Sequence, residues 1–359
     1  MKEDIYSALC EHMNKSLVAA PKTDEFIEIL RIRFTQKEAQ TALLLPLLPQ
    51  ELSMIAESAG KKVEEIRPML EQMADKGLVY KMTVLQEGKS LEFYHLFGTI
   101  MGIWETSFAK GEKTPQTEQL ASLWRQYYDA GWGKEMHRTK TPVARIIPVE
   151  KSIETQREVV PYERASELMK DEDYFAVIHC PCRSAAHLTG KGCGKPTEVC
   201  LHWGDMAKYF VERGFGRKLN KQEAFDILDI TEKAGLVHLT INTQEGCFAI
   251  CSCCSCCCNV LRAITELAKP GAVANSMYLP VVDSEKCSAC SVCEERCHVD
   301  AIKVIDDVAK VEKDKCIGCG LCATACPDEA ILLEKREDYT GPFATIEKMA
   351  EAIIMERMQ

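Results

Sequence analysis

Two runs of four cysteines in the last quarter of the chain constrain its fold more than any other feature. Each run has the spacing Cys-x2-Cys-x2-Cys-x3-Cys, and Pro327 follows the second. The runs are Cys287, Cys290, Cys293, Cys297 and Cys316, Cys319, Cys322, Cys326. A zinc site generally joins two cysteine pairs across a longer loop, whereas these cysteines recur within one continuous turn. The spacing favours an iron–sulfur cubane, because iron in such clusters takes soft thiolate ligands.

The two runs belong to an internal repeat, since EKC at 285–287 matches DKC at 314–316. Residues 280–335 resemble a bacterial-type 2[4Fe–4S] dicluster ferredoxin, in which the fourth cysteine of each run ligates the other cluster. The resemblance implies two [4Fe–4S] clusters, one held by Cys287, Cys290, Cys293 and Cys326 and the other by Cys297, Cys316, Cys319 and Cys322. His298 is a departure, because this family has proline after the fourth cysteine.

A central segment, residues 161–275, contains eleven further cysteines, which is hard to explain by core packing alone. They are Cys180, Cys182, Cys193, Cys200, Cys247, Cys251, Cys253, Cys254, Cys256, Cys257 and Cys258. The order CxCR, two more cysteines and CxCCxCCC resembles a cysteine-rich module in iron–sulfur proteins of anaerobes. In those proteins the module also lies between a winged-helix-like region and a dicluster ferredoxin.

We expect this central module to hold at least one further iron–sulfur cluster. The preferred ligands are Cys182, Cys193, Cys200, Cys251, Cys254 and Cys257, of which the last three reproduce the ferredoxin spacing. Four neighbours are credible substitutes, namely Cys180, Cys253, Cys256 and Cys258. Spacing alone does not select the set, and it leaves an unusual cluster or zinc open. For the nearby His179, His187 and His202 we expect surface or structural roles.

The overall composition is that of an ordinary globular protein, with 46% hydrophobic and 27% charged residues. The start of the chain shows no apolar segment of a secretory signal, and the longest apolar run, 42–48, is too short to span a bilayer. We therefore expect a cytoplasmic protein without membrane insertion. Because the cytoplasm keeps thiols reduced, the 20 cysteines indicate metal binding rather than disulfides.

The N-terminal part of the chain, residues 33–97, is expected to form three helices and a β-hairpin. The expected elements are a helix behind the capping pair Thr35 and Glu38, helices near 51–59 and 63–76, and hairpin strands at 79–85 and 91–97. This order resembles a winged-helix domain. Between residues 61 and 76, however, four cations face four acids, so that DNA is an unfavourable partner and a protein partner or a purely structural role is preferred.

These observations predict an α+β multidomain chain. Its parts are a winged-helix-like domain (1–108), a connector (109–160), a mixed cysteine-rich module (161–275), a ferredoxin-like 2[4Fe–4S] domain (276–336) and a C-terminal helix (337–359). That helix carries an apolar stripe, which packs on its own chain or contributes to a homo-oligomer contact. The stripe consists of Ile346, Met349, Ala350 and Ile353.

The function expected from these features is electron transfer. Phosphate-binding loops, dinucleotide-binding glycine motifs and hydrolase motifs are absent from the sequence, and no catalytic residue stands out. A subunit or redox partner of an anaerobic oxidoreductase is therefore favoured over a stand-alone enzyme. The alternatives are a redox-sensing winged-helix regulator and an oxidoreductase with catalysis at the central cysteines.

Overall fold

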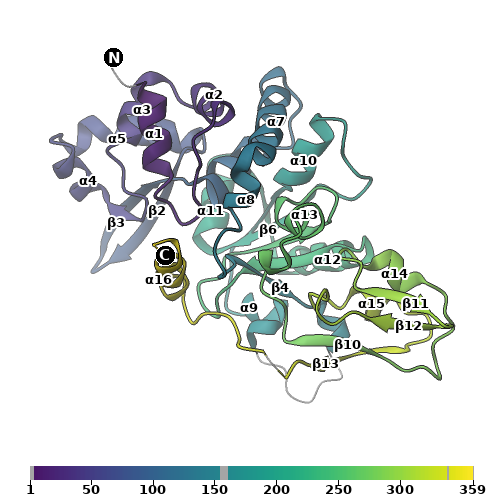
Figure 1. Cartoon of the computed structure of the whole chain (residues 1–359). Coiled ribbons are helices and arrows are strands. Elements are labelled where there is room, and N and C mark those ends of the chain that lie inside the picture. Colours follow the sequence, from purple (N-terminus) through teal and green to yellow (C-terminus); the bar gives the residue numbers. More distant parts are fainter. Residues whose placement is uncertain (1–3, 154–160, 338, 359) are drawn as a thin grey trace. The chain divides into compact units, whose positions relative to one another are not determined.

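The computed structural model describes residues 4–153, 161–337 and 339–358, which form helices and several small sheets. Figure 1 labels the helices and strands along the chain. The contacts within the chain divide it into two compact units. The first comprises Met1–Arg138, Ile178–Gly192 and Asp205–Lys218, and the second comprises Thr139–Val177, Cys193–Gly204 and Leu219–Gln359. Segments 178–192 and 205–218, expected in the central module, thus cluster with the N-terminal residues. Within the described ranges, no helix is long and apolar enough to cross a membrane.

The N-terminal part of the first unit contains the expected helices and hairpin. Its elements are α1 (Ile5–Met13), α2 (Asp24–Arg33), α3 (Gln36–Ala42), α4 (Leu52–Ser58), α5 (Val63–Asp75), β1 (Gln50–Glu51), β2 (Val79–Gln86) and β3 (Lys89–Leu96). The strand order is β1-β3-β2. Thr35 and Glu38 form the expected capping box. Helix α3 ends at Ala42, because Pro46 has no N–H to donate to the Ala42 carbonyl.

The predicted connector contributes to the core of the first unit. The further elements here are α6 (Trp104–Phe108), α7 (Pro115–Tyr127), α8 (Gly133–Glu135), α10 (Pro181–Leu188) and α11 (Gly204–Glu212), with single π-turns at Thr99–Ile103 and Tyr128–Trp132. Phe26 of α2 stacks on Tyr127 with ring centroids 4.7 Å apart, and Trp124 lies 5.0 Å from Trp132. All four rings are buried, so this segment supplies hydrophobic core as well as a connection.

The second unit is built on a β-sheet. Four neighbouring strands of this sheet are, in order, β4 (Ala144–Ile147), β8 (Val237–Ile241), β9 (Ala249–Cys253) and β6 (Glu198–Trp203). Strand β4, which lies between Pro142 and Pro148, is at the edge of this sheet. Further elements of this part are α9 (Ala165–Leu168), α12 (Lys221–Lys233) and α13 (Asn259–Thr265), with short 3-10 turns at Glu150–Ile153, Pro161–Glu163 and Pro270–Ala272. Strands β5 (Phe175–His179) and β7 (Arg217–Leu219) cross the unit boundary.

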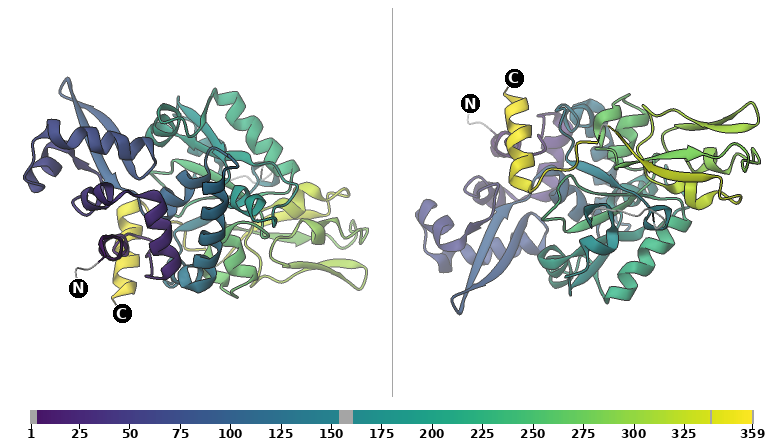
Figure 2. Two further views of the ribbon diagram at one scale, coloured as in Figure 1. Left: turned by 90° about the horizontal axis from the view of Figure 1, so that it is seen from above. Right: turned by 90° about the horizontal axis from the view of Figure 1, so that it is seen from below.

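The two cysteine runs lie in a compact segment of the second unit, coloured green to yellow in Figure 2. Strand β10 (Tyr278–Val282) pairs with β13 (Ile331–Lys335), and β11 (Ile302–Ile305) pairs with β12 (Val308–Val311), both antiparallel. The short helices α14 (Val292–Arg296) and α15 (Leu321–Ala325) occupy equivalent places in the two repeats. The sequence repeat is therefore also a repeat of local structure.

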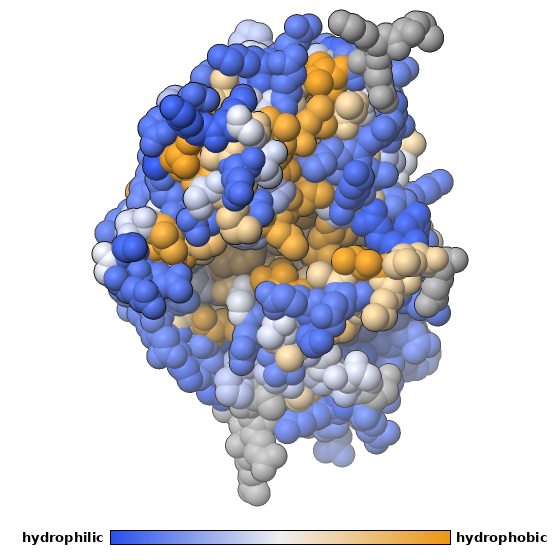
Figure 3. All heavy atoms as spheres, turned by 90° about the vertical axis from the view of Figure 1, so that its left-hand side faces the viewer, coloured by the Kyte–Doolittle hydropathy of each residue, from blue (hydrophilic) through white to orange (hydrophobic). Residues whose placement is uncertain are grey.

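The last helix, α16 (Ile346–Arg357), has one buried and one exposed apolar face. Met349 and Ile353 of the predicted stripe are buried. Ile354, Met355 and Met358 are 53%, 64% and 83% exposed. The molecular face drawn in Figure 3 likewise shows hydrophobic side chains, in orange, among mainly hydrophilic ones. The contribution of α16 to a homo-oligomer contact stays a prediction.

Candidate metal centres

Each of two cavities in the segment that contains the two cysteine runs is lined by four cysteines. The first, here called the outer cavity, is lined by Cys287, Cys290, Cys293 and Cys326. The second, the inner cavity, is lined by Cys297, Cys316, Cys319 and Cys322. Each set combines three cysteines of one run with the fourth cysteine of the other. This is the grouping that the ferredoxin resemblance implies.

Left-handed backbone turns position the first cysteines of both runs. In the second run, Gly318 and Gly320 have φ values of 74° and 79°. A Cβ on Gly318 would lie 2.3 Å from the carbonyl oxygen of Tyr278, so glycine is required there by space as well as by conformation. The chain can therefore wrap closely around the inner cavity.

Backbone N–H groups donate to three of the cysteine sulfurs. Ala301 N donates to Cys297 Sγ at 3.1 Å, and Ala330 N donates to Cys326 Sγ at 3.3 Å. In both repeats the donor lies four residues after the fourth cysteine. A third bond joins Ala309 N to Cys287 Sγ at 3.5 Å. Such donors stabilise thiolate charge and tune the potential of an iron–sulfur cluster.

The two cavities differ in exposure. Cys290 of the outer cavity is exposed, whereas Cys316 of the inner cavity is buried. Burial raises the pKa of Cys319 to about 12, so this thiol stays protonated until a metal displaces the proton. Cys316 shares a hydrophobic core with Val237 and Leu239 of strand β8. The inner cavity thus adjoins the central sheet of the same unit.

Four cysteines of the central module form a separate group. They are Cys193, Cys254, Cys256 and Cys257, whose sulfurs all lie within 4.8 Å of one another. Cys193 comes from the loop before β6, and the other three lie in the turn between β9 and α13. A hydrogen bond with the Cys254 thiol, together with burial, raises the pKa of Cys257. The group can hold a metal ion once its thiols lose their protons.

The six predicted central ligands fall into three places. Cys193, Cys254 and Cys257 meet in the group just described, together with Cys256. Cys200 and Cys251 face each other across strands β6 and β9, with their sulfurs 3.8 Å apart. Cys182 lies beside Cys180 in the first unit. Cys256 was expected only as a substitute, and the Cys-x-Cys-Cys turn is the signal that favours it.

His298 connects the inner cavity to the central cysteine turn. Ser255, between Cys254 and Cys256, donates its backbone N–H to His298 Nδ1 at 3.3 Å. Because Nδ1 accepts, the other ring nitrogen carries the proton, and Nε2 donates to the Gly235 carbonyl at 2.6 Å. His298, which stands where the ferredoxin family has proline, is therefore hydrogen-bonded to two residues of the central module.

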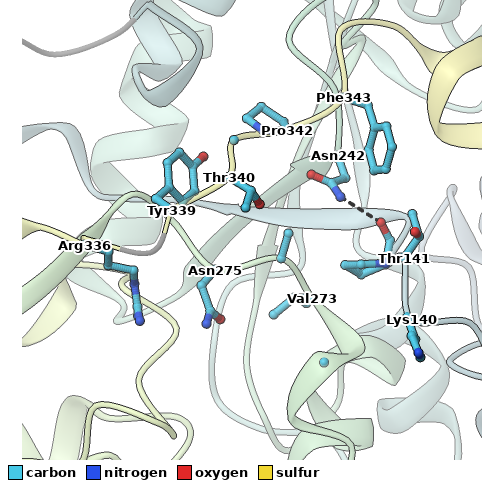
Figure 4. Close-up of a pocket in the computed structure, with 14 residues that line it drawn as sticks. Lys140, Thr141, Asn242, Val273, Asn275, Arg336, Tyr339, Thr340, Pro342 and Phe343 are labelled. Carbon is cyan, nitrogen blue, oxygen red and sulfur yellow. Dashed lines mark hydrogen bonds between the residues drawn. The ribbon is translucent and has the colours of Figure 1, made fainter. Parts of the chain in front are cut away.

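A cleft of about 580 Å³ lies elsewhere in the second unit, with Lys140 and Arg336 on opposite sides (Figure 4). Asn242 Nδ2 donates to the carbonyl of Pro142 at its edge, at 3.0 Å. Arg336 also donates to the backbone carbonyl of Cys316, one of the inner-cavity cysteines. Among the described residues that line the cleft there is no cysteine.

Comparison with known families identifies one part of the chain. Residues 309–332 match the 4Fe-4S binding domain, and this range includes all four cysteines of the second run. The searches of curated proteins and of solved structures found no match. The chain thus carries a 4Fe–4S binding domain and a separate cysteine group, which indicates an iron–sulfur electron-transfer role.

Proposed function

We propose that the chain is an iron–sulfur electron-transfer protein, acting as a subunit or redox partner of an anaerobic oxidoreductase. Its dicluster ferredoxin module exchanges electrons with a further redox centre in the central cysteine-rich module. The observation that carries this proposal is the pair of cavities, each lined by three cysteines of one run and the fourth of the other. The match of residues 309–332 to the 4Fe-4S binding domain also supports it.

The residues around both cavities fit [4Fe–4S] clusters in number and chemistry. Each cavity presents four thiols, and a cubane takes four cysteine ligands. The N–H donors from Ala301, Ala309 and Ala330 are placed to stabilise bound thiolates. A [4Fe–4S] cluster gains and loses single electrons, so the protein needs to hold it and tune its potential rather than to bind a substrate.

The different surroundings of the two cavities support different roles in electron transfer. Cys290 exposes the outer cavity to solvent, which suits exchange with a partner protein. The inner cavity adjoins the core of the central sheet, and His298 joins it to Ser255 in the central cysteine turn. The inner cavity is therefore suited to exchange within the chain.

Charge around the ferredoxin module favours a basic partner surface. Residues 283–338 contain 14 acidic and 8 basic residues, which gives this segment six of the ten net negative charges of the chain. Opposite charge on a redox partner accelerates encounter and fixes its orientation. We propose that the partner docks near the outer cavity.

The first unit is proposed to have a winged-helix-like arrangement that docks protein rather than DNA. Arg67 of α5 pairs with Glu92 of the hairpin, and Lys76 pairs with the buried Glu38 at 2.6 Å. Lys81 pairs with both Glu71 and Glu92. Cations that are neutralised within the fold contribute little to phosphate binding.

Anaerobic purification of the full chain, followed by iron and acid-labile sulfide analysis, tests the ferredoxin proposal. Cys319→Ser removes an inner-cavity thiol and should lower iron by about four per chain, the content of one cubane. The matched control is Cys247→Ser, because the Cys247 sulfur contacts oxygen atoms of Ile241 and Thr243. The control should keep the full iron content. Unchanged iron in Cys319→Ser, or iron absent from the wild type, would contradict the proposal.

A further inference from the structure

We propose that Cys193, Cys254, Cys256 and Cys257 bind one tetrahedral metal ion, iron or zinc, and not a multi-iron cluster. This inference rests on the proposed function and names the metal chemistry of the central centre: iron there would be the further redox centre, whereas zinc would contradict that part of the proposed function and leave the proposed ferredoxin clusters unaffected. The four residues are brought together by one turn, which supplies three of them, and by a loop 61 residues earlier, which supplies Cys193.

The distances between the sulfur atoms match a single ion. Cys193 Sγ lies 3.9 Å from Cys254 Sγ and 3.8 Å from Cys257 Sγ, and Cys256 Sγ lies 3.8 Å from Cys257 Sγ. Four thiolates bound tetrahedrally at about 2.3 Å from one ion are separated by about 3.8 Å. In a cubane each thiolate binds a different iron, so the sulfurs are spread around the cluster and lie farther apart.

The ferredoxin cysteines of the same chain provide an internal comparison. Among the residues that the structure describes, the central four are the one group of three or more such ligands that meets within 4.8 Å. The eight ferredoxin cysteines instead surround two cavities. The structure therefore contains two kinds of thiol arrangement, an open one around each cavity and a closed one in the central turn.

The local backbone explains how the turn gathers three thiols. Cys254 accepts hydrogen bonds at its carbonyl from the N–H groups of Cys257, at 3.4 Å, and Cys258, at 3.0 Å. The turn thereby brings Cys254, Cys256 and Cys257 to one side, with the Cys-x2-Cys spacing common in tetrathiolate sites. Binding of a divalent ion requires four thiolates and releases up to four protons, leaving a centre with a net charge of about −2.

Iron and zinc both fit a site of four thiolates, but only iron would make this site a redox centre. A tetrahedral set of four sulfurs accepts either zinc or iron. Iron bound there changes charge by one electron and serves as the further redox centre of the proposed function. Zinc has no redox chemistry, and it would fix the turn against His298 without carrying electrons.

The test compares metal and labile sulfide in the full-length wild type, in Cys257→Ser and in the control Cys247→Ser, all purified anaerobically. We expect Cys257→Ser to lose about one equivalent of iron or zinc, with labile sulfide unchanged, and the control to lose none. Loss of about four irons with their sulfide, or loss of no metal, would overturn the inference.

A measurement on the wild type keeps the test valid if the variant does not fold. For zinc, X-ray absorption at the zinc edge should show sulfur neighbours alone at about 2.3 Å. For iron, the oxidised protein should show the paramagnetic signal of a mononuclear high-spin ion. Absence of both signals would contradict the single-ion centre. If both signals are absent but the iron of the ferredoxin module is present, only this inference fails. If the iron of the ferredoxin module is missing as well, the proposed function is also refuted.

Discussion

Ala289 in the first cysteine run and Gly318 in the second occupy equivalent positions, and both have a left-handed backbone, with φ of 55° and 74°. Two residues further on, Ser291 (φ 61°) and Gly320 (φ 79°) repeat this relationship. A Cβ in this conformation costs about 1–2 kcal/mol that glycine avoids. The first run therefore carries backbone strain that the second does not.

Replacing Ala289 with glycine should stabilise the protein by about 0.5 kcal/mol. The relief of left-handed strain exceeds the greater freedom that glycine gives the unfolded chain, which is about 0.4–1 kcal/mol. Thermal unfolding of the anaerobic protein measures the change. Ala323→Gly in helix α15 is the matched control and should lower the midpoint. A midpoint for Ala289→Gly at or below that of the wild type would refute this explanation.

The reverse exchange, Gly318→Ala, should disrupt the inner cavity. Its new Cβ would lie 2.3 Å from Tyr278 O and from Ser276 Oγ, in addition to the left-handed strain. We expect loss of about four irons per chain or a destabilisation of more than about 2 kcal/mol. Gly271→Ala is the control, because nothing lies within 4 Å of its added Cβ. Equal iron content and stability in the two variants would contradict the close packing at Gly318.

The bond between His298 and Ser255 should contribute to stability without being needed for cluster binding. His298→Leu leaves Ser255 N–H and the Gly235 carbonyl without their ring partner, at a cost of about 1–3 kcal/mol. Ser255→Ala keeps the backbone donor and should cost less. Chemical unfolding measures both, and iron analysis should give the wild-type content in both. If the two variants are equally stable, the backbone bond is not the important contact.

Local signals in the sequence account for much of the fold. The capping box at Thr35 is formed as expected and begins helix α3, and a second capping box, at Asn220, begins helix α12. The spacing of the two runs, read with the ferredoxin resemblance, implied the sets of cysteines that line the two cavities. These features depend on residues a few positions apart, or on a pattern shared with a known family.

Features that depend on long-range packing could not be predicted in this way. The sequence placed Cys193, Cys254 and Cys257 in one preferred set of ligands, but it did not separate them from Cys200 and Cys251, which pair with each other across two strands. Trp124 similarly lies in a segment expected to be a connector, and it is buried by residues distant in sequence. Such contacts are set by tertiary packing, which local periodicity does not encode.

Acid should destabilise the second unit through His238. This buried ring contacts Thr231 Oγ1 at 2.9 Å, and burial lowers its pKa to about 4. An unfolded histidine titrates near about 6.5, so the unfolded chain takes up the proton first. The stability from the neutral ring is therefore fully present above about pH 6.5 and is lost as the pH falls toward 4, by at most about 3 kcal/mol.

Urea unfolding of wild type and His238→Gln at pH 7 and pH 4.5 measures this dependence. Glutamine keeps a donor for Thr231 but does not titrate in this range. We expect the stability difference between the two proteins to shrink at the lower pH, and other acid effects, including any on bound clusters, cancel in the comparison. A difference that stays constant would show that His238 does not determine the acid sensitivity.

DNA binding by the first unit should be absent or non-specific. A DNA-binding protein needs several uncompensated cations, because neutralised phosphates supply most of the affinity. Arg67, Lys76 and Lys81 are all engaged with carboxylates of the same unit, and the net charge of the chain is −10.

Titration of duplex DNA at about 0.1 M salt, with the protein both oxidised and reduced, is the decisive measurement. We expect dissociation constants no tighter than the non-specific range, about 10⁻⁶ M or weaker. Glu92→Gln offers a sensitised variant, since it removes a carboxylate that pairs with both Arg67 and Lys81 and should strengthen non-specific binding by a small factor. Specific, redox-dependent binding by the wild type well below 10⁻⁶ M would instead favour a redox-sensing regulator, with the metal centres as the sensor and the first unit as the DNA-binding part.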